Sequence, residues 1–108
     1  MQYQQQQQQQ QQFPNPLINA VRRNDVDLIK RLLSNGADAK ATNNNGETAL
    51  MYAARKGDER MVEILLPKSD AKATNWRKET AYDLAKKYQR NQIVRLLQQY
   101  QVSLISES

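Results

Sequence analysis

Apolar residues recur at helical spacing from position 17 onward, in three stretches that each break once in the middle. The first stretch places apolar clusters on both sides of Asn24-Asp25, which predicts two short helices joined by a tight break. Asp25 is a natural N-cap for the second helix, and Gly36 suits the left-handed position after it. The same pattern recurs over 48–67, where Thr48 is the expected cap and Pro67 the stop, and again over 80–100. The chain therefore reads as three helix–break–helix units.

The segments between these units also repeat. The hexapeptide DAKATN occurs at 38–43 and again at 70–75, and the first of these loops ends in a strong turn signal at Asn45-Gly46. Ala20, Ala53 and Ala85 fall in one column of the aligned copies, at spacings of 33 and 32 residues. A period of this length indicates a stacked repeat architecture. The expected fold class is an all-α repeat, or α-solenoid.

The aligned copies resemble the ankyrin repeat family. The match is carried by TALMYAARKGDERMVEILL in the middle copy, by NPLINAVRRNDVDLIKRLLSNGAD in the first and by TAYDLAKKYQRNQIVRLLQQY in the third. The resemblance implies three stacked helix-turn-helix repeats with extended or β-turn loops. Two glycines depart from the pattern: Gly46 becomes Lys78 in the third copy, and Gly57 becomes Asn24 and Gln89 in the other copies. We expect these changes to weaken local stability but not the fold.

The pattern divides the chain into three parts. We expect a disordered Gln-rich arm at 1–14, a repeat domain at 15–101 and a polar C-terminal tail at 102–108. The repeats span about 15–42, 43–74 and 75–101. The arm is either a low-complexity interaction segment or a tolerated expansion outside the fold.

Polar residues at both ends of the array suggest capping repeats. One apolar column turns polar only in the first copy, at Arg31, and two others only in the last, at Lys86 and Gln98. Terminal repeats need a polar outer face. We therefore expect a complete array of three repeats, with chance drift at three columns as the alternative.

The amino-acid composition excludes several kinds of catalytic and metal-binding function. The chain has no Cys and no His, which removes thiolate and imidazole chemistry and most zinc sites. No phosphate-binding loop or catalytic constellation is visible, so we expect no enzyme, no cofactor and no metal. No apolar run approaches the length of a membrane span. The expected location is the cytoplasm, with the nucleus as the alternative, and the expected state is a monomer.

The net charge of +5 favours acidic partners without choosing among them. The family resemblance implies a protein-interaction module whose contacts come from loop tips and exposed positions of each first helix. Carried over to this chain, the partner-binding positions are Arg22, Arg23, Asn44, Asn45, Glu47, Tyr52, Arg55, Lys56, Trp76, Arg77, Glu79, Lys87 and Tyr88.

Three of these cations occupy matched positions in successive copies: Arg22, Arg55 and Lys87. Stacking would set them in a row on one concave basic face, unless they are only solvated charges that keep the array soluble. Trp76 is the single Trp and sits at a loop tip, either as a binding hot spot or packed on the neighbouring loop.

The leading hypothesis is therefore an adaptor that binds another protein with an acidic or mixed-charge surface. Nucleic-acid binding through the same basic face is the less favoured alternative, since no nucleic-acid motif is present. A third reading is an assembly or scaffold role driven by the Gln-rich arm.

Overall fold

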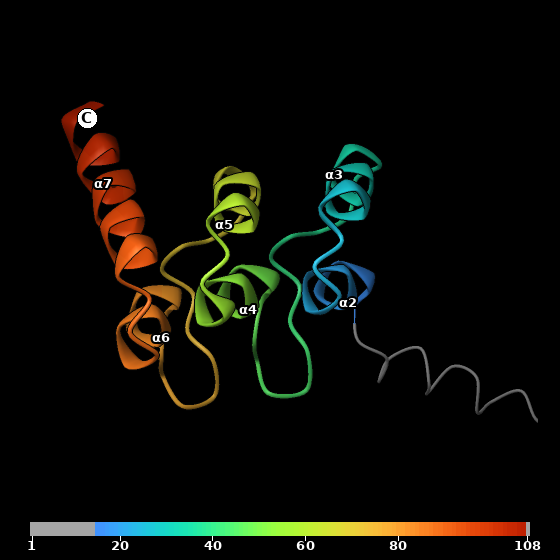
Figure 1. Cartoon of the computed structure of the whole chain (residues 1–108), viewed down its shortest axis with the longest axis horizontal. Coiled ribbons are helices and arrows are strands. Elements are labelled where there is room, and N and C mark those ends of the chain that lie inside the picture. Colours follow the sequence, from blue (N-terminus) through green and yellow to red (C-terminus); the bar gives the residue numbers. More distant parts are fainter. Residues whose placement is uncertain (1–14, 108) are drawn as a thin grey trace, which may run out of the picture.

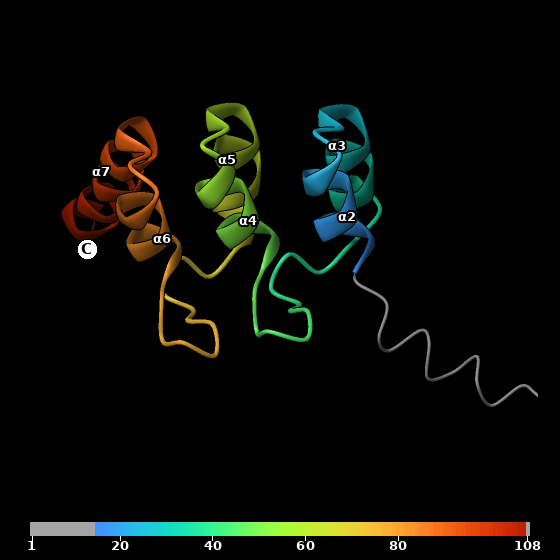
Figure 2. The same ribbon diagram turned by 60° about the horizontal axis from the view of Figure 1, so that its bottom comes forward.

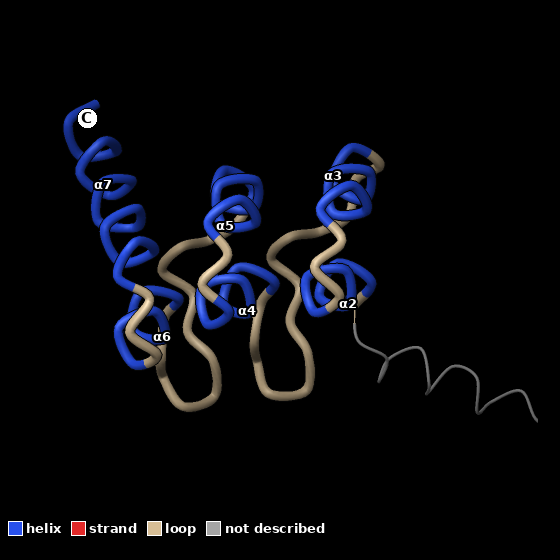
Figure 3. Tube along the Cα trace, in the orientation of Figure 1, coloured by secondary structure: helices blue, strands red, loops and turns tan. Residues whose placement is uncertain are grey.

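The computed structural model describes the backbone of residues 15–107 and the side chains of residues 15–100, so the expected Gln-rich arm lies outside the described residues. Within the described range the chain forms six α-helices and one 3₁₀ turn, and no strand (Figure 3). The elements are α2 (Pro16–Arg22), α3 (Val26–Ser34), α4 (Ala49–Lys56), α5 (Glu59–Leu65), η1 (Leu66–Lys68), α6 (Ala81–Lys87) and α7 (Asn91–Glu107).

The helices pair within each repeat and the pairs stack in a row. Helices α2, α4 and α6 pack side by side in one layer, called the inner layer below, and α3, α5 and α7 form a second layer that lies above them in Figure 1. The resulting body measures 54 × 30 × 28 Å, which is the elongated shape of a stack rather than of a sphere. The predicted all-α repeat of three helix-turn-helix units is confirmed.

Side-chain caps begin the helices where the sequence predicted them. The Asp25 side chain accepts a hydrogen bond from the Leu28 N–H at the start of α3, and Thr48 does the same for Met51 at the start of α4. Gly36 has a φ of 91° after α3, and the N–H of Ala37 bonds back to the Leu32 carbonyl. This pattern is the glycine-terminated helix end, which satisfies carbonyls that a helix leaves unpaired.

The core lies between neighbouring repeats, where small residues let the helices of the inner layer approach one another. Ala20, Ala53 and Ala85 each have an exposed fraction of 0%. Leu50 from α4 and Leu65 from α5 are buried in the middle repeat, which has a neighbour on each side. Burial of this apolar surface between repeats is the main stabilising contribution in a stacked array.

The last helix is longer than the sequence indicated. Helix α7 continues to Glu107, past residue 101 where we expected the repeat domain to give way to a polar tail. The three polar positions of the terminal repeats, Arg31, Lys86 and Gln98, all lie exposed.

Three residues with side chains adopt a left-handed backbone: Asn24, Lys78 and Gln89, with φ of 62°, 67° and 61°. Lys78 aligns with Gly46 of the middle repeat, and Asn24 and Gln89 align with Gly57. The repeat geometry therefore imposes the glycine conformation on residues that bear a Cβ. A left-handed L-residue costs about 1–2 kcal/mol, which gives the physical reason to expect local weakness here; the weakness itself stays a prediction.

Glycine at position 89 should therefore stabilise the third repeat. We expect Gln89→Gly to raise the free energy of unfolding by about 0.5–1 kcal/mol, since relief of strain exceeds the added entropy of the unfolded chain. Asn24→Gly is the matched control and should change little, because Asn tolerates this conformation. Urea unfolding monitored by circular dichroism measures both; an equal gain in the two variants would contradict the strain explanation.

Candidate functional site

Two long loops project from the inner layer of helices and run alongside each other (Figures 1 and 2). In the first loop, the side-chain oxygen of Asn43 accepts hydrogen bonds from the backbone N–H groups of Asn45 and Glu47, at 2.9 and 3.0 Å. Asn75 makes the equivalent pair of bonds in the second loop, both at 2.9 Å. The Asn residue that ends each DAKATN hexapeptide therefore stabilises the turn that follows it.

The Asp residue that begins each hexapeptide has a similar role. The side chains of Asp38 and Asp70 accept hydrogen bonds from the backbone N–H groups of Lys40 and Lys72, at 2.9 and 3.0 Å. Such bonds from a short polar side chain to the backbone two residues ahead stabilise tight turns. The hexapeptide is thus a loop-forming element.

The two loops are joined through Trp76. Its backbone N–H donates to the carbonyl of Asn45 at 3.1 Å. Its indole lies so close to Gly46 that a Cβ added there would sit 2.5 Å from Cδ1. Yet 74% of Trp76 remains exposed. One edge of Trp76 therefore packs on the neighbouring loop, as one alternative predicted, while most of the residue is exposed; the binding hot spot stays a prediction.

A groove of about 400 Å³ opens between these loops and helices α4 and α6. Nine of the thirteen sequence-predicted positions meet in its lining: Asn45, Glu47, Tyr52, Arg55, Trp76, Arg77, Glu79, Lys87 and Tyr88. The remaining lining residues, Asn75 and Leu84, were not predicted. Asn75 could have been found in the sequence, because it is the last residue of the repeated hexapeptide DAKATN. Leu84 could not, because its place in the apolar pattern is that of a core residue.

The charge of Arg55 is held inside the groove. Its guanidinium lies 3.1 Å from the carboxylate of Glu47 and 4.7 Å from the centre of the Tyr52 ring. Burial opposes the charge on Arg55, but the hydrogen bond and attraction to Glu47 outweigh it and raise the pKa of Arg55. Only 7% of Glu47 is exposed, so it is not an exposed side chain of the groove, and its role in partner binding stays a prediction. Glu47 instead fixes the position of Arg55.

A second pair repeats this arrangement one repeat further along. The ammonium of Lys87 lies 3.1 Å from the carboxylate of Glu79, which also accepts a 3.1 Å hydrogen bond from the Asn75 side chain. The Asn75 hydrogen bond, then the Lys87 hydrogen bond and charge, with a smaller contribution from Arg77, lower the pKa of Glu79. Glu79 therefore stays ionised at lower pH than an ordinary glutamate, and the Lys87 pair persists with it.

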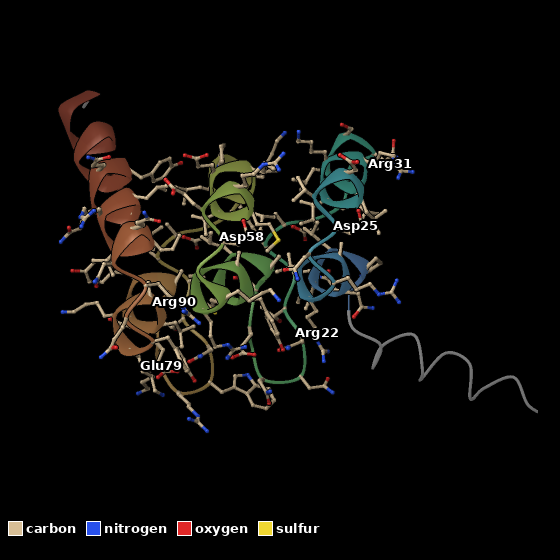
Figure 4. The ribbon with its side chains drawn as sticks, in the orientation of Figure 1. Arg22, Asp25, Arg31, Asp58, Glu79 and Arg90 are labelled. Carbon is tan, nitrogen blue, oxygen red and sulfur yellow. The ribbon has the colours of Figure 1, made fainter. Side chains whose placement is uncertain are left out.

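The predicted row of cations is accordingly not a uniform basic face. Two of its three members, Arg55 and Lys87, are paired with carboxylates of the preceding loops. Arg22 is exposed and makes no ion pair with any of the residues that the structure describes. Figure 4 places Arg22 and Glu79 on the side of the molecule from which the loops project. The face alternates acid and base in the second and third repeats.

Four predicted positions, Arg22, Arg23, Asn44 and Lys56, do not line the groove. The Lys56 ammonium reaches back to the Arg22 carbonyl at 3.4 Å. One repeat later the Arg90 side chain donates to the Arg55 carbonyl at 2.8 Å. Both bonds neutralise a helix C-terminus of the neighbouring repeat. Arg90, labelled in Figure 4, was not singled out in the sequence because its partner lies 35 residues away.

The described residues contain no group of three or more acidic, His or Cys side chains arranged to hold a metal ion. Among the helices that the structure describes, none combines the length and the apolar character that crossing a membrane requires.

Comparison with known proteins gives a family match and three partial relatives. A family model described as ankyrin repeats, in three copies, matches residues 17–106. Mitochondrial disaggregase of Homo sapiens is 44% identical over 71 residues, which are 66% of this chain and 10% of that protein. The Bos taurus mitochondrial disaggregase is 46% identical over 50 residues, 46% of this chain and 7% of that protein.

A probable E3 ubiquitin-protein ligase, XBOS33, of Oryza sativa subsp. japonica is 40% identical over 52 residues, 48% of this chain and 10% of that protein. The chain therefore matches a tenth or less of the length of each of these relatives.

Proposed function

Because this chain belongs to the ankyrin repeat family, we propose that it is a non-catalytic adaptor that binds another protein in the groove between its loops. Ankyrin repeats are in general protein-interaction modules. The observation that carries the proposal is that groove of about 400 Å³, lined by Trp76, Tyr88 and alternating charged side chains. Concave sites that combine aromatic rings with a few placed polar groups are favourable for binding.

The charge distribution supports a partner with an acidic or mixed-charge surface. The chain has 16 Lys and Arg against 11 Asp and Glu. Most of the acids already accept hydrogen bonds within the fold: Asp25, Asp38, Glu47, Asp58, Asp70, Glu79 and Asp83. The cations, by contrast, make only two ion pairs among the described residues. Ion pairing engages two acids and two cations among the described residues, so the excess of 16 over 11 leaves net positive charge for a partner.

The same pattern disfavours nucleic acid as the partner in the groove. A nucleic-acid strand brings a negative phosphate with every nucleotide. The groove offers those phosphates no continuous row of free cations, because Arg55 and Lys87 are paired with Glu47 and Glu79. The Gln-rich arm of the assembly hypothesis lies outside the described residues, and no observation favours that role. A monomeric state and a cytoplasmic or nuclear location remain part of the proposal.

Site-specific cross-linking tests the location and class of the partner together. A photoreactive amino acid at Asn45, which lines the groove, should cross-link a protein in an extract of the native source. The same group at Arg60, an exposed position on α5 outside the groove, is the matched control and should not capture that protein. Gel shift and mass spectrometry identify the product. Equal cross-linking at both positions, or capture of nucleic acid alone, would overturn the proposal.

A further inference from the structure

The exposed aromatic surface of this protein is concentrated at one place. Among the described residues, Trp76 and Tyr88 are the large hydrophobic side chains left exposed, at 74% and 41%. They come from different elements, the second loop and the end of α6, yet both line the same groove. Aromatic residues grouped in a concave site mark binding surfaces far more often than scattered single ones do.

Trp76 is held in place before any partner arrives. Its backbone is bonded to Asn45, and the Cδ1–Nε1 edge of its indole lies against Gly46, which has no side chain to push it away. Since 74% of Trp76 is exposed, most of the residue remains open to a partner. An anchor whose orientation is set in advance loses little conformational entropy on binding.

One cation in the groove is free to pair with a partner. Arg55 and Lys87 are each 3.1 Å from a carboxylate of this chain. Arg77, the residue after Trp76, also lines the groove and is exposed, and it makes no ion pair within residues 15–100. A free guanidinium beside an aromatic ring suits a carboxylate with an apolar neighbour, because Arg binds carboxylates through two parallel hydrogen bonds.

The combination occurs at only one of the two loops. The positions matching Trp76, Arg77 and Tyr88 in the preceding repeat are Asn44, Asn45 and Lys56. Shared repeat architecture therefore does not account for the aromatic pair and the free Arg.

We infer that the groove binds an extended acidic peptide segment that presents an apolar side chain to Trp76 and Tyr88 and a carboxylate to Arg77. This inference rests on the proposed protein-binding function and names the chemistry of its partner. A nucleotide base also stacks on Trp, but a strand brings one phosphate per nucleotide, and Arg55 and Lys87 are already paired with Glu47 and Glu79. A peptide needs only one carboxylate, at Arg77, which lines the groove and makes no ion pair among the described residues.

Defined peptide pools test this chemistry directly. The probes are four synthetic pools of equal length in which fixed positions carry Phe with Asp, Phe with Lys, Ser with Asp, or Ser with Lys. Trp76 is the single Trp of the chain, so its fluorescence reports binding at this site. We expect the Phe–Asp pool to bind most tightly and to shift the emission, and calorimetry to give its affinity.

Variants then assign the contacts. Trp76→Asn and Arg77→Asn, which install the residues of the preceding loop, should each weaken binding of the Phe–Asp pool by about 10-fold or more, and Trp76→Ala by about 30-fold. Arg60→Ala removes an exposed cation outside the groove and should leave affinity unchanged. Circular dichroism checks that each variant is folded.

The outcomes separate the two proposals. Preference for a Lys or Ser pool, or full binding by the Trp76 and Arg77 variants, overturns this inference; if Asn45 still cross-links a protein, the adaptor function stands. Failure of every pool to bind overturns the inference as well. Binding of single-stranded oligonucleotide in place of all pools, together with nucleic-acid cross-linking at Asn45, overturns both.

Discussion

Leu65→Ala should lower the free energy of unfolding by about 2–5 kcal/mol, the cost of deleting a fully buried leucine and leaving a cavity. Leu65 has an exposed fraction of 0% and belongs to the middle repeat, which is covered on both sides. Small domains have about 5–15 kcal/mol of stability in total. The variant should therefore sit close to global unfolding, measurable as a lower midpoint in urea.

The chain contains its own controls for this prediction. Leu32 and Leu97 occupy the same column in the first and third repeats. Leu32 is only partly buried, whereas Leu97 is 4% exposed. We expect Leu97→Ala to cost nearly as much as Leu65→Ala, and Leu32→Ala clearly less. A larger loss at Leu32 than at Leu65 would mean that the middle repeat is not the centre of cooperativity.

Gly46→Ala should cost about 2–3 kcal/mol and displace Trp76. Part of the cost is a left-handed backbone, with φ of 75°, which an alanine adopts at about 1–2 kcal/mol. The rest arises because the new Cβ would lie 2.5 Å from Trp76 Cδ1, so the indole must move. Urea unfolding gives the stability, and the emission spectrum of Trp76 reports its displacement.

Gly36→Ala separates the two contributions. Gly36 has a φ of 91°, but no atom lies within 4 Å of an added Cβ. This variant should lose only the backbone term of about 1–2 kcal/mol and keep the wild-type emission. Equal losses in both variants with unchanged Trp76 fluorescence would show that Gly46 does not position the ring.

Much of the fold could be predicted because its signals are local. Asp25 and Thr48 cap helices whose first turns follow them directly in sequence, and Gly36 ends a helix through its own backbone freedom. The repeat columns indicated the family and the stacking of the repeats. The end of α7 lies further along than the sequence analysis placed it: no Gly or Pro follows Gln101, and the helix continues to Glu107.

The sequence predicted most residues that line the candidate groove, but not which of them are buried or ion-paired. Aligning the repeats brought nine lining residues together, since equivalent positions of stacked repeats face the same side. The alignment could not show that Glu47 is buried or that Lys87, at the end of α6, is paired with Glu79, which precedes that helix. Those facts depend on how each loop folds back onto its own helix.

The sequence by itself determined the scaffold: three copies of one helix pair, their caps and their loop-forming hexapeptide, because these arise from contacts between near neighbours in the chain. The tertiary structure alone decided which charges are free. The pairing between Arg55 and Glu47 depends on how the first loop folds. The packing of Trp76 against Gly46 and the hydrogen bond from Arg90 to the Arg55 carbonyl depend on the register between repeats. Electrostatic and packing energies fall off over a few ångströms, and spacing along the chain does not report such distances.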